Sequence, residues 1–162
     1  MAETLNLTKT ETVTIGESSP DALVVEARYE PSSRKPPPHL HPQQDEHFEV
    51  LEGRITARVR DAERTLEAGD TFDVPRGTVH QMWNPGPDAA RVSWTTTPAG
   101  RTELWFRAID ALNREGRAGP AAFAALLREY DDVFRLAVKP EPVVRGAVGL
   151  LGRLGRLRGS RG

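Results

Sequence analysis

The first hundred residues alternate between short apolar runs and turn residues. Runs rich in valine, threonine, isoleucine and aromatic side chains are separated by glycine, proline and aspartate, which is typical of strands joined by tight turns. The predicted strands are Thr12–Ile15, Leu23–Tyr29, His47–Leu51, Ile55–Val59, Thr65–Leu66, Thr71–Val74, Val79–Trp83 and Val92–Thr97. So many short strands indicate a sandwich or barrel, and a double-sheet jelly roll fits the number of strands.

The pattern changes to a helical period after Pro98. A first helix is predicted to end at 113–116, and its apolar face is Leu104, Trp105, Ala108, Ile109 and Leu112. A second helix is predicted to begin at Pro120 and to end near 139–140. Its apolar repeat is Phe123, Leu126, Leu127, Tyr130, Val133, Phe134 and Ala137. We expect both stripes to pack against the barrel or a partner subunit rather than to hold a cofactor.

These patterns divide the chain into a β-barrel over residues 1–100, a helical extension over 101–139 and a basic tail over 140–162. From Arg145 to Gly162 the tail has five arginines and no acidic residue. Its apolar positions beside arginines predict a weak contact with an anionic membrane surface. We favour a frayed, solvated terminus over this contact, because each interior glycine costs a helix about 1 kcal/mol.

Composition narrows the function classes. A net charge of −1 over 162 residues gives no bulk attraction to nucleic acid, so no nucleic-acid partner is expected. The absence of cysteine excludes disulfides, thiolate zinc sites and cysteine nucleophiles. Because the chain has no apolar leader and no apolar stretch of about 20 residues, we expect a cytoplasmic protein. We also expect a homodimer, in which the helix faces and the strand around Val13 and Ile15 cover exposed sheet edges.

Three of the four histidines and one glutamate occur at spacings that can close a metal site. His39 and His41 face the same side of an extended segment, because alternate residues of a strand share a face. Glu46 follows after a short turn, and His80 lies on a later strand. Three imidazoles and one carboxylate suit iron, manganese, nickel or zinc and leave a position for water or substrate. The sequence therefore predicts one divalent metal ion.

The neighbours of these four residues are expected to have other roles. His47 lies on the opposite strand face from Glu46, so we expect its side chain outside the barrel. Asn84 is interpreted as a hydrogen-bonding residue near a turn rather than a ligand. The glycines at 53, 69 and 77 are interpreted as turn residues with positive φ.

Two segments resemble the motifs of a known family. Residues 39–53 are similar to the first motif of the cupins, and residues 69–84 are similar to the second at every defining position. One departure is Ser33, which stands where that family often has the glycine that opens its first motif. The resemblance covers roughly residues 20–97. It implies a six- to eight-stranded jelly-roll barrel with the helical extension outside it, and a divalent metal held by His39, His41, Glu46 and His80.

The resemblance also implies classes of function. Cupins with this ligand set include dioxygenases, isomerases, decarboxylases and polyketide cyclases, so we expect a metal-dependent enzyme with a small, largely apolar, oxygen-bearing substrate. A pocket for it is predicted from Phe48, Val50, Phe72, Met82 and Trp94, which are equally consistent with ordinary barrel core. Glu46 is the candidate catalytic residue, with Tyr29 and Asp73 as further acid–base candidates. The alternative is a non-catalytic module that binds a metal or small ligand in a regulatory or assembly role.

Overall fold

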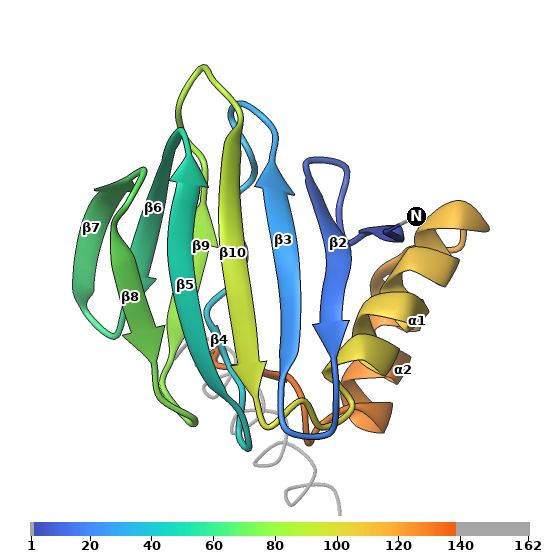
Figure 1. Cartoon of the computed structure of the whole chain (residues 1–162). Coiled ribbons are helices and arrows are strands. Elements are labelled where there is room, and N and C mark those ends of the chain that lie inside the picture. The colour runs from blue at the N-terminus through green and yellow to red at the C-terminus, as the bar shows by residue number, and fades with distance from the viewer. Residues whose placement is uncertain (1, 139–162) are drawn as a thin grey trace, which may run out of the picture.

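Two antiparallel sheets face each other in the computed structural model, which describes residues 2–138 (Figure 1). The first sheet has, in spatial order, β1 (Thr4–Asn6), β2 (Glu11–Ser18), β3 (Leu23–Tyr29), β10 (Ala90–Thr97), β5 (Asp45–Glu52) and β8 (Thr71–Val74). The second has β11 (Arg135–Leu136), β4 (His39–Leu40), β9 (His80–Trp83), β6 (Arg54–Val59) and β7 (Ala62–Glu67). The predicted mainly β, jelly-roll class is confirmed.

The core lies between the two sheets. Successive residues of β5 alternate between buried and exposed positions, so that Glu46, Phe48 and Val50 face inward. The second sheet contributes Ile55 and Met82 from the opposite side. Each fully buried large apolar side chain stabilises the fold by about 1.5–3 kcal/mol. This alternation places a polar residue, Glu46, among apolar side chains on the inner face.

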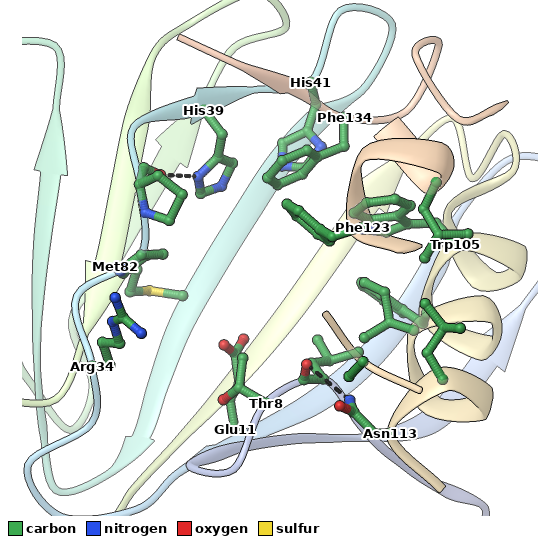
Figure 2. Close-up of a pocket in the computed structure, with 18 of the residues that line it drawn as sticks. Thr8, Glu11, Arg34, His39, His41, Met82, Trp105, Asn113, Phe123 and Phe134 are labelled. Atoms are coloured by element: carbon green, nitrogen blue, oxygen red, sulfur yellow. Dashed lines mark hydrogen bonds between the residues drawn. The ribbon is translucent and has the colours of Figure 1, made fainter. Parts of the chain in front are cut away.

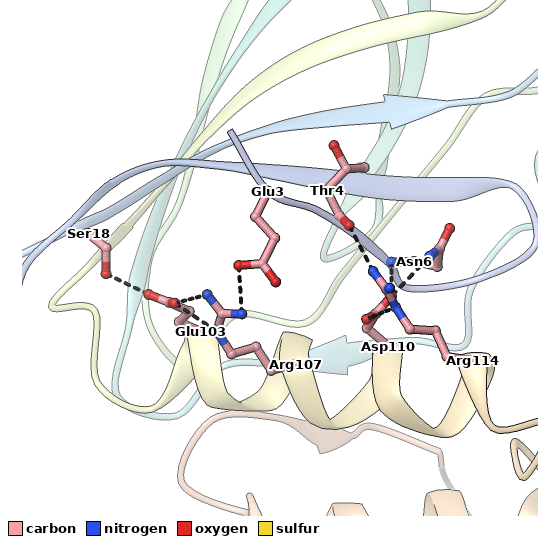
Figure 3. A network of polar contacts seen from close by, with 8 residues as sticks. All are labelled: Glu3, Thr4, Asn6, Ser18, Glu103, Arg107, Asp110 and Arg114. Atoms are coloured by element: carbon pink, nitrogen blue, oxygen red, sulfur yellow. Dashed lines mark hydrogen bonds and ion pairs between the residues drawn. The ribbon is translucent and has the colours of Figure 1, made fainter. Parts of the chain in front are cut away.

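Helix α1 (Thr102–Arg114) lies beside β1 and β2, where polar contacts attach it to the barrel (Figure 3). The buried Asp110 accepts hydrogen bonds from the backbone and side-chain nitrogens of Asn6, at 2.7 and 3.0 Å. Arg107 pairs with Glu3 at 2.9 Å and with Glu103 at 2.7 Å. Because exposed ion pairs contribute only about 0–1 kcal/mol each, the buried Asp110 is the stronger attachment.

The second helix is shorter than the apolar repeat predicts. Helix α2 (Pro120–Glu129) ends ten residues before the expected position, and the prediction that it continues to 139 is wrong. Arg101 explains the end of the helix, because its guanidinium donates to the Glu129 carbonyl at 2.6 Å and pairs with Asp132. The same guanidinium lies 4.6 Å from the centre of the Tyr130 ring. The chain then turns back, and β11 pairs with β4.

The expected dimer edge is also different from the prediction. Strand β2 pairs with β1 on one side and β3 on the other, and Val13 is fully buried. The strand around Val13 and Ile15 is therefore not free to pair with a second subunit, and the homodimer stays a prediction without that support. No helix within residues 2–138 is long and apolar enough to cross a membrane. The tail over 140–162, with its predicted membrane contact, lies outside the described residues.

Candidate metal centre and pocket

Three histidine side chains converge on one point inside the barrel. His39 comes from β4, His41 follows that strand directly, and His80 begins β9, where it is the register partner of His39. Ligand nitrogens of the three rings all lie within 4.8 Å of one another. His41 and His80 are buried, and His39 is partly exposed to the pocket. The structure therefore brings together the three histidines that the sequence singled out.

Backbone carbonyls fix the orientation of all three rings. The Nδ1 atoms of His39, His41 and His80 lie 2.9, 2.7 and 3.0 Å from the carbonyl oxygens of Pro37, Val133 and Thr78, respectively. Because a carbonyl oxygen only accepts, each Nδ1 carries the proton and donates it. The Nε2 lone pairs are then left as ligands, which is the arrangement expected of metal-binding histidines.

Glu46 lies beside two of these histidines. Its Oε1 is 3.2 Å from His41 Nε2 and accepts a hydrogen bond from the Trp94 indole at 3.0 Å, and its Oε2 is 3.0 Å from His80 Nε2. Oε2 is buried and has no partner in hydrogen-bond geometry among the described residues. Lone pairs of Nε2 facing carboxylate oxygens at this distance repel unless a proton or cation lies between them. The donor set and this buried oxygen fit a divalent cation.

Burial and mutual repulsion favour the neutral, metal-binding form of His39 and His41, whereas Glu46 favours a protonated His80 when no cation is bound. Burial, with repulsion from His80 and His41, lowers the pKa of His39 to about 3. Burial also lowers the pKa of His41. For His80, burial lowers the pKa but the contact with Glu46 outweighs it, so the pKa is raised. Burial raises the pKa of Glu46, but His41 and His80 outweigh it and the pKa is lowered, so the carboxylate is ionised.

The turn residues act as the sequence predicted. Gly53, Gly69 and Gly77 all have positive φ, and the Gly77 N–H donates to the His41 carbonyl at 2.8 Å. The Asn84 side chain donates to the Asp88 carbonyl at 2.7 Å and accepts from the Gly86 N–H at 3.0 Å. Asn84 is thus a buried hydrogen-bonding residue away from the three-histidine cluster, as predicted.

The comparisons agree with this fold. A family model described as the cupin domain matches residues 25–96. KdgF from Halomonas sp. superposes with a TM-score of 0.56 at 22% identity, over 63% of this chain and 92% of that chain, which shows the fold alone. Residues 25–96 of this chain are a cupin domain. Residues 97–138, which include both helices, lie outside the matched part.

Curated relatives match this cupin only locally. The tetracenomycin polyketide synthase protein TcmJ of Streptomyces glaucescens is 37% identical over 67 residues, which is 41% of this chain and 45% of that protein. An oxidoreductase of Arthrobotrys oligospora is 42% identical over 60 residues, which is 35% of this chain and 23% of that protein. The chain therefore spans less than half the length of these relatives.

A cavity of about 560 Å³ opens beside the three histidines of the cupin barrel. Four of the residues predicted for the pocket line it: Phe48, Phe72, Met82 and Trp94. Val50 is 1% exposed but is not among the lining residues, so it belongs to the barrel core. The pocket role predicted for Val50 therefore does not agree with the lining of the cavity.

The candidate Asp73 lies on the outer surface, beside His47. His47 and Asp73 are register partners on β5 and β8, and their side chains are 50% and 76% exposed. His47 Nδ1 lies 2.7 Å from the Asp73 carboxylate, so the two form a surface pair. The outward position of His47 agrees with the prediction. Asp73 is too far from the inner face to act in the pocket, and that candidate assignment is wrong.

The wall opposite the barrel comes from the helical extension, which the sequence pattern assigned only to packing. Phe134 stacks on His39 with ring centroids 4.7 Å apart, and Trp105 stacks on the other side of Phe134 at 5.1 Å (Figure 2). Phe123 from α2 completes this aromatic wall. The apolar stripes therefore pack against the barrel as expected and also line the pocket. The helical spacing of these apolar residues does not distinguish packing against the barrel from lining the pocket.

Proposed function

We propose that this cupin is a metal-dependent enzyme that acts on a small, largely apolar, oxygen-bearing substrate such as a phenolic, enolic or polyketide-like compound. The observation that carries the proposal is the convergence of three oriented Nε2 atoms at a cavity that is otherwise lined mainly by apolar and aromatic side chains. Structural metal sites normally close every coordination position with protein atoms, whereas this cluster faces a pocket.

In this proposal His39, His41 and His80 hold one divalent ion of iron, manganese, nickel or zinc, with Glu46 as the fourth ligand. Such an ion supplies Lewis-acid polarisation of a substrate oxygen. Phe134 and Trp105 exclude water from the side of the pocket opposite the barrel. Glu46 Oε2 is the carboxylate atom that can accept a proton, because Oε1 is held by the Trp94 indole N–H.

The relatives support this class of function without specifying it. One is a protein of a polyketide synthase and another is an oxidoreductase, and each shares about a third of its aligned residues or more with this chain. The first name agrees with a polyketide-like substrate, and the second agrees with catalysis. The helical wall lies outside the residues that match the family model. The part of the pocket that these helices line is therefore not described by the family and would select the shape of the substrate in this chain.

The test combines metal content with turnover of Glu46→Gln. Glutamine retains a carbonyl oxygen for the Trp94 N–H but cannot take up a proton as a carboxylate does. We expect turnover of phenolic and enolic compounds to fall about 10²–10⁴-fold while metal content falls much less. Elemental analysis and a substrate panel chosen from the neighbouring genes measure the two quantities.

Full activity of Glu46→Gln would make Glu46 a structural residue. Protein that takes up none of the four metals would remove the proposed metal site. Metal-loaded protein that binds such compounds tightly and converts none of them would favour the non-catalytic binding module instead.

A further inference from the structure

The end of the pocket remote from the histidines contains a carboxyl group. Glu11, at the start of β2, and Tyr29, at the end of β3, are register partners and both line the cavity. Figure 2 places Glu11 and Thr8 across the pocket from His39 and His41. Tyr29 is 3% exposed, and Glu11 is partly buried. This pair therefore faces the same cavity as the metal ligands from its opposite end.

The charge of Glu11 is not neutralised within the described residues. Glu11 makes no ion pair there, and it lines the cavity with Tyr29 from β3, Thr8 from the turn before β2, and Asn113 from α1. The charged residues Lys9, Glu30 and Arg114 line a second hollow with Glu11. Asn113 uses its amide N–H groups on the carbonyls of Asn6 and Leu7, at 2.8 and 3.2 Å. The Arg34 guanidinium lines the cavity from another side and makes no ion pair within residues 2–138.

The surroundings of Glu11 set its protonation state and leave acceptor lone pairs on its carboxylate. Burial raises the pKa of Glu11 to about 7, although the hydrogen bond from Tyr29 lowers it. The pKa of Tyr29 is raised by burial and by Glu11, so the phenol stays protonated and donates. Tyr29 is the donor assigned to Glu11 within residues 2–138, so this partly dehydrated carboxylate retains lone pairs for a ligand. A hydrogen bond to a charged acceptor contributes more than one between neutral groups.

We propose that Glu11 determines specificity by accepting a hydrogen bond from a second hydroxyl group of the substrate, at the end remote from the metal. The inference rests on the proposed function, in which the first oxygen of the substrate lies at the three-histidine cluster. The substrate class is therefore an apolar, aromatic-sized skeleton with two separated oxygen functions. A molecule with a single oxygen covers the partly buried Glu11 carboxylate but offers no donor to the lone pairs that Tyr29 does not use, which costs binding free energy.

The test uses two probes that differ only in the remote hydroxyl, 2-naphthol and 2,6-dihydroxynaphthalene. Their dissociation constants are measured by titration calorimetry on zinc-loaded full-length protein at pH 8, because zinc does not oxidise phenols. In the unsubstituted protein we expect the second hydroxyl to tighten binding about 10-fold, which is one charged hydrogen bond. In Glu11→Leu this gain should fall below about 2-fold, while 2-naphthol binds at least as tightly as before, because no carboxylate is left to be dehydrated.

Two further variants separate recognition from folding. Glu11→Gln keeps an acceptor of the same size, so it should retain part of the gain but lose its increase between pH 6 and pH 8. That increase is expected in the unsubstituted protein because Glu11 ionises in this range. Glu17→Gln changes an exposed glutamate of the same strand and should leave both affinities unchanged.

The results that overturn the proposal differ from those that overturn the metal site. If 2-naphthol binds but the second hydroxyl gives no gain in affinity, or gives the same gain in Glu11→Leu, Glu11 does not recognise the second hydroxyl. If the protein takes up no zinc or binds neither probe, the proposed function fails and the inference fails with it.

Discussion

The two walls of the pocket are held in place very differently. The barrel wall has paired strands on both sides of β9, and three backbone carbonyls fix its histidine rings. The helical wall has no buried residue in α2, and it returns to the barrel through a strand of only two residues, β11. A well-paired wall suits residues that need fixed geometry, whereas a lightly attached wall can vary in shape. We infer that metal chemistry belongs to the barrel and ligand shape to the helices.

The two walls are nevertheless connected at the metal centre. Of the three carbonyls that accept from histidine Nδ1, the one that orients His41 is Val133, which comes from the segment between α2 and β11. Leu136 of β11 is the register partner of His39. The comparison therefore predicts a graded result: ligand residues on the barrel matter most for metal binding, and residues of the helical wall matter less but measurably.

The largest effect is expected on the barrel wall, from His80→Ala. It removes one of the three clustered nitrogens, and we expect metal affinity to fall on the order of 100-fold or more, since changes outside the ligand set already cost 10–100-fold. His47→Ala is the matched control, because this half-exposed histidine pairs with Asp73 on the outer face and should leave affinity unchanged. Competition with a chromophoric chelator measures both. Equal losses would contradict the assignment of the two strand faces.

A smaller effect is expected from Phe134→Ala on the helical wall. The substitution removes the ring stacked between His39 and Trp105, so we expect about a 10-fold loss of metal affinity, as for other residues that orient ligands. Leu136→Ala is the control, because its side chain is 37% exposed on β11 in the same segment. If Phe134→Ala keeps full affinity for metal, the two walls act independently.

The same difference between the walls explains how much the sequence could predict. Alternation along β5 placed Glu46 inside and His47 outside, and positive φ at the motif glycines followed from their turn positions. These are local properties, because side-chain direction in a strand has a period of two residues. Strands β1, β4 and β11 were not predicted, because two or three residues do not establish a period.

The helical wall depends on contacts that the sequence pattern does not contain. The apolar spacing through Val133 and Phe134 predicts a continuous helix, but Arg101, 28 positions before Glu129, binds the carbonyl at the end of α2. Such a contact between distant residues overrides local propensity. The same kind of distance hid the role of Glu11, which precedes the matched motifs and reaches the pocket only because β2 pairs with β3.

The last expected effect concerns the remote end of the pocket and is a change in the pH dependence of stability in Glu11→Gln. The pKa of Glu11 is about 7 in the folded protein and near the ordinary 4.5 when unfolded. Between these values the folded state holds a proton that the unfolded state has released, so the folded protein loses stability as pH rises from 4.5 to 7. Glutamine does not ionise and avoids this loss. We expect Glu11→Gln to match the unsubstituted protein at pH 4.5 and to exceed it by roughly 1–3 kcal/mol at pH 8.

Chemical denaturation at both pH values measures this difference, with Glu17→Gln as the exposed control on the same strand. The three proteins have the same histidines, so any contribution of these residues cancels in the comparison between them. A stability difference that is the same at pH 4.5 and pH 8 would mean that water solvates the ionised Glu11 as it does a carboxylate at the surface. The remote end of the pocket would then be as well solvated as the outer face of β2, and only the metal end would be a dehydrated site.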